Sequence, residues 1–259
     1  MEDTHWEEFV GQGMGIRIAL HRIADMADQG QRQAYEDALR RIDESGARIV
    51  WNDRADVDAL VVLVTHGNSA RQIVAAVAGV DCPAIIWAVR GRWAWPSSSL
   101  AIGKLEEEGK SVTLVYGEPA EEDVVEVFQK ALRSAYAVRE LARSRIGTIG
   151  GVYPNLVSCA YDRERIRWRF GVEIADIPFA TVRKEMEAIR EDEVAAFILR
   201  TRALHTVNAD LPGRYQAGIR LHLALKRIAR QHDLEAFAVE CWSRLPEELG
   251  TNPCLGFLE

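Results

Sequence analysis

The feature that most constrains the fold is the apolar run Leu60–Val64, whose sequence is LVVLV. A strand with one solvent-exposed face would alternate apolar and polar residues, because successive side chains point to opposite faces of a sheet. An unbroken apolar run of this length instead indicates a strand that is buried on both faces, as in a parallel sheet covered by helices. The rest of the chain must therefore supply helices for both faces of that sheet.

Further strand-like segments alternate with helix-like segments along the chain. We expect apolar strands at Val57–Thr65, Pro83–Ala88, Ser111–Tyr116, Ile146–Ile149, Val172–Ile177 and Ala236–Trp242. Helical periodicity over Ala70–Val77 and Leu100–Gly109 predicts a helix in each of the two intervals between the first three strands. Alternation of this kind is the signature of a doubly wound α/β fold. We expect two Rossmann-like α/β domains with mostly parallel sheets, residues 1–143 and 144–259, connected by a helix over Glu121–Ser144.

The segment before the apolar run has a different pattern. Apolar residues at Ile16, Leu20, Ile23 and Ala27 recur at helical spacing, and Gly46 follows as a helix-ending residue. The pattern predicts one helix over residues 16–45.

Composition and charge exclude several classes of protein. The chain of 259 residues has a formal net charge of −7, which argues against a nucleic-acid-binding surface as its main function. It contains neither the ~18–20 consecutive apolar residues of a membrane span nor a signal-peptide pattern at its acidic start. Its four cysteines lack C-x-x-C spacing, and since three of them lie in apolar surroundings, buried free thiols are expected. We therefore expect a cytoplasmic protein that binds neither nucleic acid nor membrane.

Two candidate ligand-binding loops lie in the first domain, because ligands of open α/β sheets bind at the carboxyl ends of the strands. The loop after Val57–Thr65 offers an imidazole and an amide at His66 and Asn68, although a tight turn with a helix cap is the alternative interpretation. The loop after the next strand carries Arg90 and Trp93, which could bind a sugar or a neighbouring subunit, or could pack on their own domain.

Two further loops lie in the second domain. Gly150–Asn155 contains Tyr153 but lacks the spaced glycines of a dinucleotide site. The last strand, Ala236–Trp242, contains Glu240 among apolar residues, and a buried carboxylate needs a metal ion or another partner. Pairing with Arg244 is the alternative to a metal-ligating role for Glu240.

Several segments resemble the L-fucose/L-arabinose isomerase family. The segments AFAVECWSRLPEELGTNPCLGFL and RIGTIGGVYPNL resemble the start of that family's catalytic domain and the first strand and loop of its middle domain. FGVEIADI is similar to the strand that follows. The residues from PAIIWAVRG to SVTLVYG resemble the last part of the family's N-terminal α/β domain. The match extends from about Val57 onward, and the order and spacing of the segments match as well.

The resemblance implies an aldose–ketose isomerase that transfers a proton between C1 and C2 through an enediolate. It implies a divalent cation, usually Mn²⁺, with Glu240 as the first metal ligand and a catalytic residue. His66, Asn68, Arg90, Trp93 and Tyr153 become candidate monosaccharide-binding residues. The family also implies a homo-oligomer, by analogy a trimer or hexamer.

The resemblance also implies residues that this sequence lacks. The second carboxylate should lie some twenty or more residues beyond Glu240, and the metal-binding histidine in a further C-terminal domain, whereas the sequence ends at Glu259. The chain is therefore expected to be a fragment or a shortened relative that does not complete the metal site alone. A non-catalytic sugar-binding α/β module, of the periplasmic-binding or regulatory type, is the alternative function.

Overall fold

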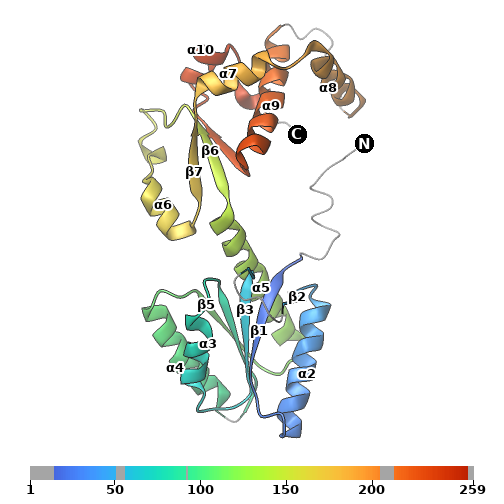
Figure 1. Ribbon diagram of the computed structural model, residues 1–259, viewed down its shortest axis with the longest axis vertical. Coiled ribbons are helices and arrows are strands. Elements are labelled where there is room, and N and C mark those ends of the chain that lie inside the picture. The colour runs from blue at the N-terminus through green and yellow to red at the C-terminus, as the bar shows by residue number, and fades with distance from the viewer. Residues whose placement is uncertain (1–14, 51–55, 92, 205–212, 256–259) are drawn as a thin grey trace. The chain divides into compact units, whose positions relative to one another are not determined.

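The computed structural model describes residues 15–50, 56–91, 93–204 and 213–255 (Figure 1). The chain divides into two compact units, Met1–Glu140 and Leu141–Glu259, and each contains its own sheet. Helix α5 (Glu122–Arg143) contains the boundary between the units. Every strand pairing in the described part of the chain is parallel, which confirms the expected α/β fold with mostly parallel sheets.

The first unit is a five-stranded sheet with strand order β2-β1-β3-β4-β5, one of the two common orders of doubly wound folds. Its strands are β1 (Arg17–Ile23), β2 (Arg48–Ile49), β3 (Ala59–Val64), β4 (Ala84–Ala88) and β5 (Val112–Tyr116). The helices of this unit are α2 (Gln29–Glu44), α3 (Ala70–Ala78), α4 (Ala94–Glu107) and α5.

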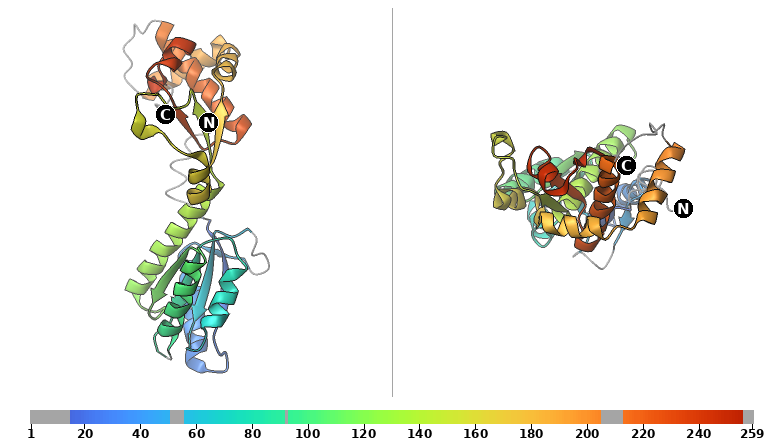
Figure 2. Two further views of the ribbon diagram at one scale, coloured as in Figure 1. Left: turned by 90° about the vertical axis from the view of Figure 1, so that its left-hand side faces the viewer. Right: turned by 90° about the horizontal axis from the view of Figure 1, so that it is seen from above.

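Both faces of this sheet are covered, which explains the unbroken apolar run in β3. Val61 and Leu63 pack with residues of α2 and α5. Leu60, Val62 and Val64 pack with residues of α3 and α4. Figure 1 shows α2 and the α3–α4 pair on opposite sides of the strands, and Figure 2 turns α3 and α4 toward the viewer.

The prediction of a single helix over residues 16–45 was wrong in its first part. Residues Arg17–Ile23 form β1, which pairs with both β2 and β3 and therefore lies inside the sheet. The helix α2 begins only after Asp28, whose side chain accepts a 3.0 Å hydrogen bond from the backbone N–H of Gln31. The apolar residues of β1 fit a helical and an extended period about equally, and pairing between two neighbouring strands decided the outcome.

The second unit has a three-stranded sheet with strand order β7-β6-β8. Its strands are β6 (Arg145–Ile149), β7 (Glu173–Ile177) and β8 (Ala236–Val239). Its α-helices are α6 (Arg163–Phe170), α7 (Phe179–Glu187), α8 (Glu191–Leu204), α9 (Gly213–His232) and α10 (Arg244–Leu249), and two 3₁₀ turns lie at Val157–Cys159 and Pro253–Leu255.

Helices α7, α9 and α10 build the core of the second unit together with the ends of its strands. The core contains Ile149 and Ile177 from the sheet, Val182 from α7 and Leu225 from α9. Helix α6 contributes nothing to it, because none of its residues is buried. This core holds the carboxyl ends of β6 and β7 in fixed positions.

The expectation of buried cysteines was wrong, because none of the four is fully buried. Cys82 is half-buried, whereas Cys159, Cys241 and Cys254 are exposed, and all four are free thiols. Burial raises the pKa of the Cys82 thiol. Within the described ranges, no helix is long and apolar enough to cross a membrane. The acidic start of the chain, residues 1–10, lies outside the described residues.

Candidate functional site

A pocket of about 550 Å³ lies at the carboxyl edge of the second sheet. Ile149 at the end of β6 is in register with Ile177 of β7 and Val239 of β8, so the loops that follow the three strands meet at one edge. The pocket is lined by residues from these loops and from the helices after them: Thr148, Gly150, Gly151, Asp176, Ile177, Pro178, Phe179, Ala180, Arg183, Arg244 and Glu248. This is the edge at which open α/β sheets bind ligands.

Glu240 lies next to this pocket, in the turn between β8 and α10. The prediction that Glu240 lies inside the last strand was wrong, because β8 ends at Val239 and Glu240 follows it. It borders two pocket-lining residues: a Cβ atom placed on Gly150 would lie 3.0 Å from Glu240 Cβ, and the backbone N–H of Arg244 donates a 2.8 Å hydrogen bond to Glu240 Oε2. The side chain is buried, with 5% of its surface exposed.

The buried Glu240 carboxylate is held by the backbone of its own turn. Oε1 accepts hydrogen bonds from the backbone N–H groups of Trp242 (3.1 Å) and Ser243 (3.0 Å) and from Ser243 Oγ (3.4 Å). The Arg244 guanidinium donates instead to the carbonyl oxygen of Gly150, at 3.2 Å. Glu240 is therefore partnered by backbone amides, including that of Arg244. The predicted alternative, pairing with the Arg244 side chain, does not occur, because that guanidinium donates to Gly150.

Two opposing effects set the pKa of Glu240. Burial is the largest single effect and raises the pKa, but the hydrogen bonds from Ser243, Arg244 and Trp242 together lower it below the ordinary value. These donors stabilise the charged form, so Glu240 is ionised at neutral pH. An ionised carboxylate with a lowered pKa suits an electrostatic or ligating role better than that of a general base, which works best with a pKa near the operating pH.

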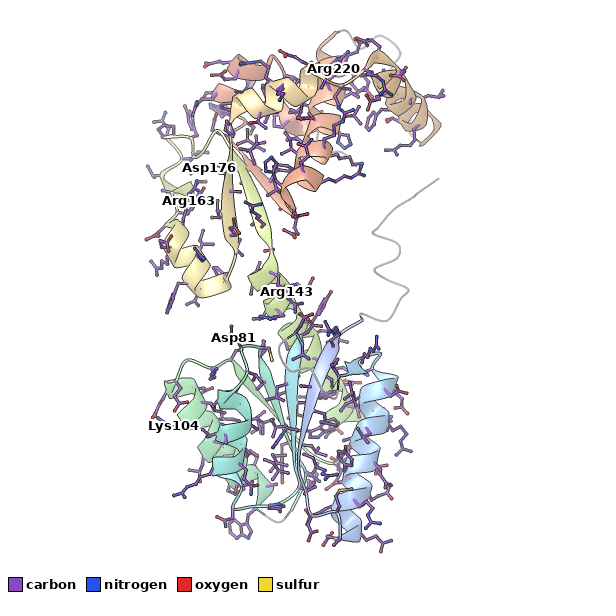
Figure 3. The ribbon with its side chains drawn as sticks, in the orientation of Figure 1. Asp81, Lys104, Arg143, Arg163, Asp176 and Arg220 are labelled. Atoms are coloured by element: carbon purple, nitrogen blue, oxygen red, sulfur yellow. The ribbon has the colours of Figure 1, made fainter. Side chains whose placement is uncertain are left out.

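Asp176 places a second carboxylate at the pocket, at the end of β7. Its Oδ1 accepts a 2.8 Å hydrogen bond from Thr148 Oγ1 on β6 and forms an ion pair with Arg163 at the start of α6 (Figure 3). The Arg163 hydrogen bond, followed by that of Thr148, lowers the pKa of Asp176. Asp176 is therefore held as a charged hydrogen-bond acceptor.

Two arginines and an aromatic ring complete the polar part of the pocket. Arg183 on α7 pairs with Glu248 on α10, at 2.7 Å between Nη2 and Oε2. The Arg244 guanidinium carbon lies 5.2 Å from the centre of the Phe179 ring, which places a cation over an aromatic face. Each charged group that lines the pocket thus has a partner of its own.

The described residues do not form a complete metal site around Glu240. Across residues 15–50, 56–91, 93–204 and 213–255, no group of three or more His, Cys, Asp or Glu side chains is placed to hold a metal ion. Glu240 Oε1 accepts three hydrogen bonds, whereas Oε2 accepts one and has lone-pair capacity for another. Glu240 could supply one ligand atom to a cation, and the remaining ligands would have to come from elsewhere.

The candidate residues of the first unit lie in the loops after β3 and β4. His66 and Asn68 follow β3, and His66 Nδ1 lies 2.8 Å from the carbonyl oxygen of Gly67. β3 and β1 flank the point where the strand order reverses, which is the ligand-binding position of doubly wound sheets. At that point Thr65 Oγ1 and the buried Gln31 side chain form a 2.6 Å hydrogen bond.

Arg90 and Trp93 follow β4 at the same edge. Arg90 forms a 2.9 Å ion pair with Glu121 and lies over the ring of Tyr116, so its side chain is partnered within its own unit. Trp93 is 79% exposed and has a left-handed backbone, with φ of 62°. A tryptophan in that conformation is strained, and such residues cluster at functional sites.

The strain at Trp93 leads to a prediction about stability. Trp93→Gly should raise the free energy of unfolding by roughly 0.5–1 kcal/mol, because glycine adopts positive φ without steric strain. Chemical denaturation measures the change. Trp95→Ala, which removes another exposed tryptophan from the same loop and helix start, serves as the control and should bring no gain. Equal stabilisation by both substitutions would contradict strain as the cause.

Tyr153 lies in the second unit, half-buried in the loop after β6, where its hydroxyl accepts a 3.1 Å hydrogen bond from Asn155 Nδ2. It is absent from the pocket lining. Asp176 and Arg183 line the pocket and were not predicted from the sequence, whereas Arg244, which also lines it, was predicted only as a partner of Glu240. The rule that ligands bind after parallel strands would have found Asp176 had it been applied to the end of Val172–Ile177. Arg183 lies on the next helix, and no pattern in the sequence indicates that it lines the pocket.

Comparisons with known proteins do not identify a family for this chain. No protein-family model matches it, and no curated protein matches it with significance.

Proposed function

We propose that this chain is the α/β part of an aldose–ketose sugar isomerase of the L-fucose/L-arabinose isomerase type. The observation that carries the proposal is the buried, ionised carboxylate of Glu240 beside a pocket at the carboxyl edge of the second sheet. A buried carboxylate is costly unless it is partnered. The loop backbone meets most of that requirement, and Glu240 Oε2, which accepts the N–H of Arg244, has a further lone pair that can accept a hydroxyl group or ligate a cation.

The balance of charge in the pocket favours a neutral polyol over a phosphorylated sugar. Arg183 and Arg244 contribute two cations, and Asp176 and Glu248 contribute two carboxylates. Arg163, which pairs with Asp176, and the ionised Glu240 beside the pocket add one charge of each sign, so no net positive charge is left to attract a phosphate group. The carboxylates can accept hydrogen bonds from sugar hydroxyl groups, and Arg244 can donate to them.

The resemblance to the isomerase family supplies the reaction. The substrate aldose would lose the proton on C2, and return of a proton to C1 with a shift of hydrogen between the oxygens would give the ketose. A divalent ion such as Mn²⁺ would polarise the two substrate oxygens when bound. With its lowered pKa, Glu240 would hold charge at this site, and another group would take the proton from carbon.

A non-catalytic sugar-binding module is the second candidate function. The observation that favours it is the hydrogen bonding of Glu240, whose carboxylate is engaged mainly by Trp242, Ser243 and Arg244 of its own turn. In that case Glu240 would fix the loop at the rim of the pocket, and the sugar would bind without being converted.

Ketose formation by the product of the full reading frame distinguishes the two functions. With Mn²⁺ present, we expect turnover of at least one of L-fucose, D-arabinose and L-arabinose. Glu240→Gln should lower kcat about 100-fold or more, the loss typical of removing a group that stabilises charge in the transition state. Glu247→Gln, at a carboxylate of the adjacent helix α10 that is exposed whereas Glu240 is buried, is the matched control and should retain activity.

Three outcomes of this experiment bear on the two functions. Turnover that requires Mn²⁺ and Glu240 supports the isomerase. Binding of one of these sugars in calorimetry without turnover overturns the isomerase and supports the binding module. The absence of both turnover and binding overturns both functions. Circular dichroism of each variant must match that of the parent protein, so that a loss of activity reports on the site.

A further inference from the structure

The segment of residues 154–171, which connects β6 to β7 and contains α6, is left uncovered by its own unit. Ile166 is half-buried, and every other residue of the segment is exposed. In Figure 1, α6 stands on the outer side of β7, away from α7, α9 and α10. A helix this short is marginal in water by itself, because most helices owe their stability to an apolar face packed on other elements. The segment is therefore a surface that is available to a partner.

This uncovered segment carries several large apolar side chains. Trp168 is 83% exposed and Val157 is 82% exposed, and about half of the surface of Leu156 and Phe170 is exposed. Single apolar residues are normal on a protein surface, whereas several within one short segment mark an interaction site. The pocket beside Glu240 uses none of them.

Three arginines of α6 are left without a carboxylate partner in the described part of the chain. Arg163 is engaged in its ion pair at the pocket, whereas the guanidinium groups of Arg165, Arg167 and Arg169 form no ion pair or hydrogen bond there. Arg165, Trp168 and Arg169 are spaced i, i+3 and i+4, so they share one side of the helix. We call these three residues the α6 face; it combines an exposed aromatic ring with two unpaired cations.

The charge of the α6 face selects an acidic partner surface. A symmetric contact between two copies of α6 is disfavoured, because it would bring like charges together. The chain itself supplies acidic surface: its first unit, Met1–Glu140, has 23 Asp and Glu residues against 15 Lys and Arg, whereas Leu141–Glu259 has 16 against 17. The first unit of a second copy therefore complements the α6 face in charge.

Helix α4 of the first unit has a surface that is apolar at one end and acidic at the other. Leu100 is 72% exposed and lies on the same side of the helix as Glu107, seven residues further on. The acidic run Glu106–Glu108 has one ion-pair partner among the described residues, Lys104. The nearby Lys110 donates instead to a backbone carbonyl oxygen. Carboxylate charge is therefore left over at this end of α4.

Gly103 lies between Leu100 and Glu107 on the same side of α4. A Cβ atom placed on Gly103 would have no neighbouring atom within 4 Å. Glycine inside a helix destabilises the helix relative to alanine, and no described residue packs against this position to require it. A glycine there does allow the helix of another molecule to approach closely. We call Leu100, Gly103 and Glu107 the α4 face.

We propose that the chain associates head to tail, with the α6 face of one copy packed against the α4 face of a second copy. Trp168 would cover Leu100 and Gly103, and the two arginines would pair with the acidic end of α4. Because the two faces differ, the assembly either closes into a ring or continues to grow. The contact uses no residue of the pocket lining, so it does not depend on the proposed isomerase function.

Analytical ultracentrifugation of the full chain at increasing protein concentration tests this proposal. We expect a mean mass that rises with concentration and falls as salt is added, because charge pairing contributes to the contact. Trp168→Ser should weaken association roughly 30-fold, the loss typical of an aromatic anchor at the centre of an interface. Lys184→Glu, which reverses an exposed cation on α7, is the control and should leave association unchanged.

Charge reversal distinguishes a second copy of the chain from any other partner. The double variant Arg165→Glu/Arg169→Glu should weaken self-association roughly 100-fold, and Glu106→Arg/Glu107→Arg should do the same, because each places like charges across the contact. Mixing the two double variants should restore association, because the reversed α6 face of one then meets the reversed α4 face of the other. Circular dichroism of each variant must match that of the parent protein.

Several results would overturn this proposal. A monomer at every concentration overturns it, as does association that Trp168→Ser leaves unchanged or that Lys184→Glu weakens equally. Failure of the mixed double variants to associate overturns it too, because α6 and α4 would then not face each other. A chain that stays monomeric but binds oligouridylate or anionic lipid vesicles through α6 overturns it in favour of nucleic acid or membrane. Glu240→Gln should leave association unchanged, so failure of the isomerase proposal does not affect this result.

Discussion

Glu240→Ala should lower the free energy of unfolding by roughly 3 kcal/mol. The substitution removes the acceptor of three backbone N–H groups in the turn before α10 and leaves them without a partner, at a cost of about 1–3 kcal/mol for each buried group that water does not reach. Urea denaturation at neutral pH measures the change. Glu247→Ala, at an exposed position of α10, is the matched control and should change the free energy by less than about 1 kcal/mol.

The contribution of Glu240 should depend on pH. Its pKa in the folded protein is lowered from 4.5, so its charge stabilises the fold fully above that value and the contribution is lost as the pH falls through the folded pKa. The stability difference between the parent protein and Glu240→Ala should therefore be larger at pH 7 than near pH 3. A difference that is the same at both pH values would contradict a role for the ionised carboxylate.

Gly171→Ala should also be strongly destabilising, by roughly 3 kcal/mol. Gly171 ends α6 with φ of +77°, and an added Cβ atom would lie 2.6 Å from Ala142 Cα and 3.0 Å from the Ala142 carbonyl oxygen. The backbone of α5 is unable to move aside as a flexible side chain would. The substitution therefore combines the strain of positive φ with overpacking against a neighbouring helix.

Gly250→Ala separates the two causes. Gly250 ends α10 with a similar φ of +68°, but no atom lies within 4 Å of the Cβ position. This substitution should cost about 1 kcal/mol, the value for the left-handed backbone alone. Thermal or chemical denaturation of both variants measures the difference. If the two variants lost the same stability, the close approach of Ala142 would have no energetic consequence.

Much of the fold was predictable from local patterns. The LVVLV run indicated a strand with two buried faces, and β3 contacts helices on both sides because each face carries its own apolar residues. The first strand was not predictable in the same way. The residues Arg17–Ile23 fit a helix about as well as a strand, and their position between β2 and β3 selected the extended form.

The candidate site was predictable only in outline. The sequence indicated that loops after parallel strands would meet, and that Glu240 would need a partner. It did not indicate that this partner is the turn of Trp242–Arg244, because the path of the chain after β8 decides which N–H groups face the carboxylate. The joining of Asp176 to Arg163 likewise depends on the crossover that returns the chain from α6 to β7.

The sequence by itself determined the class of fold and the edge of each sheet at which a ligand would bind. The reason is that hydrophobic periodicity is a local property, and the carboxyl ends of parallel strands share an edge whatever their loops contain. Only the tertiary structure decided which polar groups meet at that edge and how each is charged. Hydrogen bonds and ion pairs join residues that lie far apart in the chain, such as Thr148 and Asp176, and the pKa of a carboxylate depends on those partners.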